Sequence, residues 1–115
     1  MNNKIFSAHI TWLTSSQGGR KGPIPFETNR YMPIISIDDN TIFNGNAWSV
    51  ICYSYELVDQ HTTNAYMKFF IYEKAPDVLF KGTEFKLQEG GHVVASGIID
   101  DIVDREEVDN LFKLK

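Results

Sequence analysis

Residues 83–103, TEFKLQEGGHVVASGIIDDIV, contain two predicted strands and the turn between them. Phe85 and Leu87 alternate with polar residues, which is typical of a strand with one buried face. Glu89-Gly90-Gly91 supplies residues that favour a tight turn, and His92–Val103 is rich in Val and Ile. The segment therefore predicts a hairpin and points to an all-β fold.

The chain before this hairpin repeats the pattern of strand and turn. The predicted strands are 5–13, 31–37, 47–57, 65–73, 83–88 and 92–103. Turn or loop residues lie between them at 14–25, 38–40, 44–46 and 59–64, and residues 76–82 form a crossing segment. Six strands in 115 residues predict a small closed barrel or sandwich. Closure would also protect the edges of such aromatic strands.

The alternation along each strand predicts which side chains are buried. A register error of one residue would exchange the two faces of a strand, so each assignment depends on regular pairing. The predicted core residues are Phe6, Ile10, Trp12, Val50, Phe69, Phe85, Val94 and Ile98.

The tail after residue 103 has a different periodicity. Asp104 and Glu107 form a pattern like a capping box, with Asp in place of Ser or Thr. Val108, Leu111 and Phe112 follow at the spacing of one helical face. We expect a short helix over 104–113, with a fraying tail as the alternative. The domain organisation is then a β-barrel over 1–103 and a helical extension of the same domain over 104–115.

Composition indicates one globular domain and limits its partners. The apolar fraction is 43% and the net charge is −4, which excludes disorder and disfavours binding to phosphate backbones. The low use of cysteine fits a reducing compartment. We expect the one cysteine, Cys52, to be a buried apolar residue, with a reactive thiol as the alternative. The sequence has neither a signal-peptide core nor 18 consecutive apolar residues, so we expect a cytoplasmic protein without membrane contact. We also expect a monomer or a weak homodimer.

Three motifs occur in an order that resembles a known domain. They are Gly18-Gly19-Arg20 followed by Tyr31 and Pro33; Ala75-Pro76 with Leu79, Gly82 and Phe85; and Glu89-Gly90-Gly91 followed by Val94, Gly97 and Ile99. Together they resemble the third domain of the translation elongation factor Tu family. This resemblance implies a small closed six-stranded antiparallel β-barrel.

The chain departs from that family at several points. No phosphate-binding loop is present, so the sequence carries no GTPase half. His61-Thr62-Thr63-Asn64 replaces the family's Met-Pro-Gly-Asp hairpin, and Gln88 and His92 replace basic residues beside the Glu-Gly-Gly turn. These changes weaken an inference to tRNA binding.

The resemblance implies a partner-binding surface at one end of the barrel. Its predicted residues are Gly18, Gly19, Arg20, Lys21, Glu89, Gly90 and Gly91. Glycines let another backbone approach closely, and an arginine binds phosphate or carboxylate with two parallel bonds. The alternative is structural: the glycines serve turns with positive φ, and Arg20 pairs with Glu89 inside the domain. In both cases we expect the two loops to lie near one another.

The sequence offers no pattern for catalysis, a metal or a cofactor. His9, His61 and His92 are far apart in sequence and lack ligand spacing. The acidic residues over 100–109 lack the spacing of a calcium loop and indicate a solvated face or a docking surface for a basic partner. No Gly-x-Ser-x-Gly elbow is present. We therefore expect no catalytic residues, no metal and no cofactor.

The expected function is a non-enzymatic protein-interaction module. Such a barrel could copy the surface of the elongation factor, or act as an immunity or regulatory protein against a toxin. The second hypothesis is an RNA- or tRNA-binding module that uses the Gly-Gly-Arg loop, although the acidic charge disfavours it. A hydrolase is the least favoured.

Overall fold

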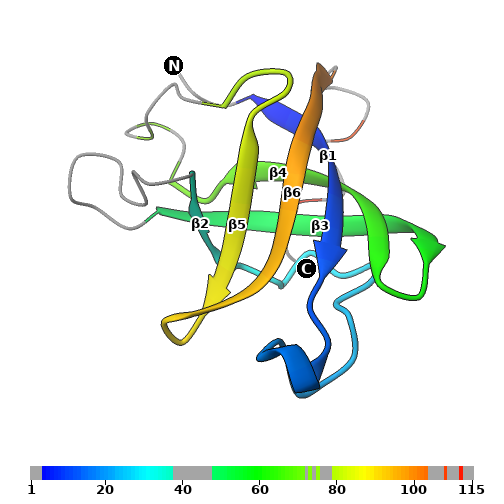
Figure 1. Cartoon of the computed structure of the whole chain (residues 1–115). Coiled ribbons are helices and arrows are strands. Elements are labelled where there is room, and N and C mark those ends of the chain that lie inside the picture. The colour runs from blue at the N-terminus through cyan, green and yellow to red at the C-terminus, as the bar shows by residue number, and fades with distance from the viewer. Residues whose placement is uncertain are drawn as a thin grey trace.

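Six strands make up most of the described chain (Figure 1). The computed structural model describes residues 4–37, 48–71, 73, 75, 79–103, 108 and 112. The strands are β1 (Ile5–Trp12), β2 (Ile34–Ser36), β3 (Trp48–Asp59), β4 (Thr62–Phe69), β5 (Glu84–Glu89) and β6 (His92–Val103). One 3-10 helix, η1 (Ser15–Gln17), follows β1.

The strands form a closed ring in the order β1-β4-β3-β2-β5-β6, and β6 pairs with β1 to complete it. Every neighbouring pair is antiparallel. The predicted all-β fold with six antiparallel strands is therefore confirmed. Because the ring closes, each strand has a hydrogen-bonded neighbour on both sides, which protects strand edges from pairing with other chains.

The boundaries of β4 differ from those predicted. The turn before it needs only Gln60 and His61, so β4 begins at Thr62 rather than at residue 65. Thr62 and Thr63 are buried strand residues. Because both are polar, the sequence pattern had placed them in the turn. The strand ends at Phe69, before its predicted end at residue 73, and Ile71 is 52% exposed in the turn that follows.

The short strand β2 covers only the middle of its predicted range, 31–37. Pairing with β3 nevertheless extends further towards the N-terminus. The carbonyl oxygen of Pro33 accepts a bond from the amide of Val50, and that of Tyr31 from the amide of Cys52. Proline has no amide hydrogen to donate, and Pro33 accordingly lies immediately before β2 rather than inside the strand. The predicted turns at 38–40 and 44–46 lie outside the described residues.

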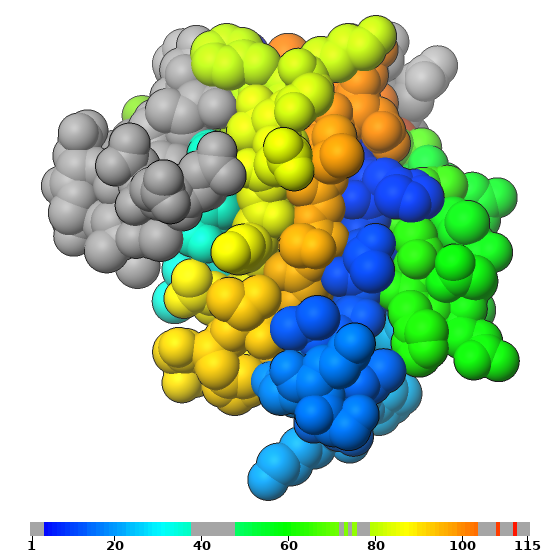
Figure 2. Space-filling model, viewed as in Figure 1, coloured from blue at the N-terminus to red at the C-terminus, as the bar shows by residue number. Residues whose placement is uncertain are grey.

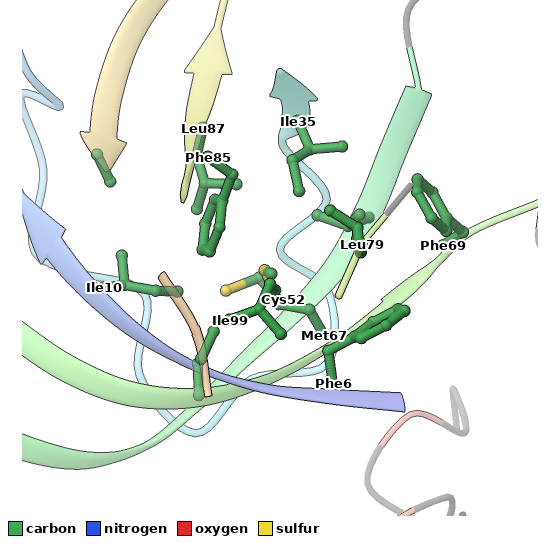
Figure 3. Packing of buried hydrophobic residues seen from close by; sticks show 14 of the residues in the cluster. Phe6, Ile10, Ile35, Cys52, Met67, Phe69, Leu79, Phe85, Leu87 and Ile99 are labelled. Carbon is green, nitrogen blue, oxygen red and sulfur yellow. The ribbon is translucent and has the colours of Figure 1, made fainter. Parts of the chain in front are cut away.

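The interior of the barrel is filled by apolar side chains from all six strands (Figure 3). The predicted core residues are buried except for Ile98, which is 45% exposed. The main cluster consists of Phe6, Ala8, Ile10, Trp12, Ile35, Val50, Cys52, Ala65, Met67, Phe69, Leu79, Phe85, Leu87, Val94, Ala95 and Ile99.

A β-bulge in β6 explains why the prediction for Ile98 was wrong. Leu87 pairs with Ala95, but the next residue of β5, Gln88, pairs with Val93, so Val94 is an extra residue. Val94 and Ala95 are both buried, and the inward face then continues to Ile99 instead of Ile98. A bulge of this kind reverses the alternation for the rest of the strand.

A second cluster lies on the outer surface of the barrel. Ile5 and Ile51 point away from the main core and are covered by Val108 and Phe112. Most of the predicted helix over 104–113 lies outside the described residues; Val108 has helical backbone and Phe112 a 3-10 conformation. Val108 and Phe112 are therefore buried against the barrel, whereas the helix stays a prediction.

Candidate functional site

The loop after β1 is held in a fixed path by a short cap. Thr14 accepts the amide of Gln17, and the Gln17 side chain accepts the amide of Thr14, which forms a capping box on η1. Gly18 ends η1 with a φ of 89°. Gly19 is required by packing, because a Cβ there would lie 2.3 Å from the carbonyl oxygen of Leu13. The chain then leads directly into Arg20.

Arg20 is bonded to the far end of β5. Its Nη1 donates to Oε2 of Glu89 at 2.5 Å, and its Nε donates to the carbonyl of Pro23 at 3.3 Å. The Tyr31 hydroxyl donates to the same Glu89 oxygen, and the Arg20 guanidinium lies 5.1 Å from the centre of the Tyr31 ring. One carboxylate therefore joins the loop after η1, the segment before β2 and the end of β5.

The surroundings keep Arg20 charged and Tyr31 neutral. Burial and the neighbouring Glu89 carboxylate raise the pKa of Tyr31 far above its ordinary value. Burial lowers the pKa of Arg20, but its bonds to Glu89 and Tyr31 outweigh this effect and the pKa is raised. The side chains of Arg20 and Glu89 are 26% and 33% exposed, so solvent still reaches the pair.

The two predicted loops therefore meet at one end of the barrel, as expected (Figure 2). Gly90 and Gly91, with φ values of 56° and 85°, form the β5–β6 turn beside them. The structural alternative for Arg20, an internal pair with Glu89, is what the side chains form. Whether this end of the barrel also binds a partner stays a prediction.

A cleft of about 500 Å³ lies next to the Arg20 and Glu89 pair. Three segments border it: the end of β1 with η1, the loop over 20–26, and the β3–β4 hairpin. Its lining residues are Trp12, Leu13, Thr14, Ser15, Arg20, Lys21, Gly22, Pro23, Ile24, Phe26, Leu57, Gln60 and His61. Leu57 is 56% exposed in this cleft, and its neighbour Val58 is 50% exposed on the same hairpin.

Of the predicted site residues, Arg20 and Lys21 line the cleft, whereas the other five do not. Sequence reasoning missed Ile24, Phe26 and Leu57. One signal was available in the sequence. Ile24 and Phe26 are large apolar residues in a loop rich in glycine and proline, where they are not part of a strand's buried face.

A smaller groove of about 220 Å³ lies on the outside of the barrel over β1, β5 and β6. His9, which lines it, shares a hydrogen bond of 3.0 Å with Asn64, and Asn64 donates to Glu56 at 2.6 Å. Glu84 and Lys86 bring opposite charges to the same groove. Across the described residues, no three His, Cys, Asp or Glu side chains are grouped as metal ligands would be.

No protein-family model matches this chain, and no curated protein matches it in sequence. In the described part of the chain, no helix is both long enough and apolar enough to cross a bilayer. The candidate site therefore rests on the geometry of the Arg20 end of the barrel and on the chemistry of the cleft.

Proposed function

We propose that this protein is a non-enzymatic, cytoplasmic protein-interaction module that resembles the third domain of elongation factor Tu. It binds its partner at the end of the barrel that carries Gly18–Lys21 and Glu89–Gly91. The observation that carries this proposal is the cleft beside Arg20, in which the exposed side chain of Leu57 and the Arg20 side chain, paired with Glu89, border one hollow.

Exposed aliphatic side chains support a protein partner. Leu57 and Val58 are adjacent on the β3–β4 hairpin, and each keeps about half of its surface in water. Leu57 lines the cleft, and exposed apolar surface within a cleft is typical of interaction sites. A net charge of −4 disfavours the alternative, an RNA-binding module, because phosphate binding depends on accumulated positive charge.

Two roles are consistent with such a module. It copies a surface of the elongation factor and captures a protein that binds the factor, or it binds and neutralises a toxin as an immunity protein. Both roles use a preformed surface and need no chemistry from the chain, so they share one test.

The test is affinity capture from the native cell with two matched variants. Leu57→Asp places a charge in the cleft, and Phe80→Asp places one at a side chain of similar exposure, 53%, before β5. We expect a protein that is retained by the wild type and by Phe80→Asp, lost with Leu57→Asp, and bound directly when purified. Retention by all three forms contradicts the proposal, and so does a signal that nuclease treatment removes.

A further inference from the structure

The cleft beside Arg20 has a chemistry that selects among protein partners. We propose that it binds an extended segment of a partner protein in which a carboxylate side chain lies next to a large apolar side chain. This inference rests on the proposed function and specifies the ligand of the same site.

The apolar half of the segment follows from Leu57, Ile24 and Phe26. Leu57 is 56% exposed, and Ile24 and Phe26, which line the same cleft, are only partly buried. A large apolar side chain inserted between the hairpin and the loop would remove surface of all three from water. Burial of apolar surface is the main favourable term in association.

The carboxylate half follows from the charges that border the cleft. The lining contains Arg20 and Lys21 but neither Asp nor Glu, although the chain has 15 acidic and only 11 basic residues. Lys21 is exposed, and within the described residues no ion pair engages it. Because Glu89 offsets the charge of Arg20, Lys21 supplies the uncompensated positive charge of the cleft, and this charge complements a partner carboxylate.

The protein fixes the position of the Arg20 guanidinium at the border of the cleft. Its Nη1 and Nε are bonded to Glu89 and Pro23, and its Nη2 lies 3.8 Å from the position that a Cβ on Gly22 would take. Gly22 is itself a lining residue, so the guanidinium borders the cleft while two of its nitrogens are fixed by the protein. A group held in this way loses little conformational freedom on binding.

A nucleic acid fits this site less well than a peptide. Glu89 neutralises the charge of Arg20, which leaves Lys21 as the main uncompensated cation of the cleft. Binding to a phosphate backbone uses several such cations along a strand. The aliphatic side chain of Leu57 suits an apolar residue better than it suits a stacked base, for which proteins use aromatic rings.

The experiment is a calorimetric titration of the full chain with four short capped peptides. The first carries adjacent Asp, Glu and Phe residues; the second replaces both carboxylates by amides; the third replaces them by lysines; the fourth replaces Phe by Ser. We expect the first peptide to bind best, with binding weakened by added salt. Lys21→Glu should weaken it by at least about fivefold, because it removes one attraction and adds one repulsion. Lys81→Glu, an exposed lysine before β5, should leave it unchanged.

Equal binding of the acidic, amide and lysine peptides, or tighter binding of a single-stranded RNA to the cleft, would overturn the ligand chemistry. If none of the peptides binds while Leu57→Asp still abolishes capture of the native partner, the ligand inference fails and the proposed function stands. If capture does not depend on Leu57, the proposed function fails as well.

Discussion

Arg20 and Glu89 lie 69 positions apart in sequence, and their side chains are joined by a hydrogen bond of 2.5 Å. Tyr31 donates its hydroxyl hydrogen to the same carboxylate oxygen. The pair joins the loop after η1 to the β5–β6 hairpin at one end of the barrel. It also forms one border of the cleft, so the same residues stabilise the fold and shape the candidate site.

Replacing Arg20 by Ala should lower the free energy of unfolding by about 1 kcal/mol, because Glu89 would keep only the Tyr31 hydroxyl as a partner. The partial exposure of both side chains keeps the cost at this level, since water can solvate the remaining carboxylate. Urea unfolding at neutral pH measures it. Lys21→Ala is the control and should change stability little, because Lys21 is exposed. Equal stabilities of the two variants would show that the Arg20 pair contributes nothing to folding.

Replacing Thr63 by Val should destabilise the barrel by about 1–3 kcal/mol at nearly constant side-chain shape. The Thr63 hydroxyl is buried, accepts the indole hydrogen of Trp12 at 2.9 Å, and shares a second bond of 2.9 Å with Ser54. Valine would leave the Trp12 indole without that acceptor. Thermal unfolding measures the effect, with Thr11→Val, at an exposed position on β1, as the matched control. Equal effects of the two substitutions would contradict the role of the buried bonds.

The pattern of apolar residues predicted the fold class because each strand buries one face and most strands alternate regularly. The pattern gave wrong assignments where the alternation along a strand is interrupted. The extra residue Val94 moves the inward face of β6 from Ile98 to Ile99, and no local feature of the sequence marks such a bulge. It also failed at Thr62 and Thr63, because buried polar residues look like turn residues in the sequence; the partners of Thr63, Trp12 and Ser54, are known only from the structure.

The candidate site was predictable only in part. The pairing of Arg20 with Glu89 was an explicit alternative, because the resemblance brought the two loops to one end of the barrel. The cleft was not predicted, since it depends on how Leu57 on the hairpin approaches Ile24 and Phe26 in the loop. The relative position of the hairpin and the loop follows from packing and not from local sequence.

The stability of the protein should fall at alkaline pH through Cys52. Complete burial raises the pKa of its thiol to about 12, from a reference value of 9.0. Between these values the unfolded chain has lost the thiol proton while the folded chain keeps it, so the unfolded state binds fewer protons. The free energy of unfolding therefore falls as the pH rises above about 9, by up to about 1.4 kcal/mol per pH unit.

Comparison with Cys52→Ala isolates this contribution. The pKa values of Tyr31 and Tyr55 are also raised, by burial first, and act in the same direction, but only from about pH 10 upwards. Urea unfolding across the alkaline range should give a shallower decline for Cys52→Ala than for the wild type. The variant's lower stability at neutral pH, from the cavity, does not affect the slope. Parallel curves would contradict the assignment.

The contacts of Val108 and Phe112 predict what the tail does for the barrel. Both are almost completely buried against Ile5 and Ile51, and the Lys68 ammonium lies 5.5 Å from the centre of the Phe112 ring. A helix as short as the one predicted over 104–113 is marginal alone in water, so packing must hold it. Burial of each large apolar side chain contributes roughly 1.5–3 kcal/mol.

Deleting residues 104–115 should therefore lower stability and promote self-association, because it would leave Ile5 and Ile51 uncovered on the outside of the barrel. Phe112→Ala should reproduce a loss of about 2 kcal/mol, whereas Phe80→Ala, at a side chain that is 53% exposed, should cost little. Thermal unfolding and sedimentation velocity measure the two effects. If the tail instead serves as a partner-binding helix, protease should cleave rapidly after Arg105 or Lys113 without loss of barrel stability, and that result would contradict the docked tail.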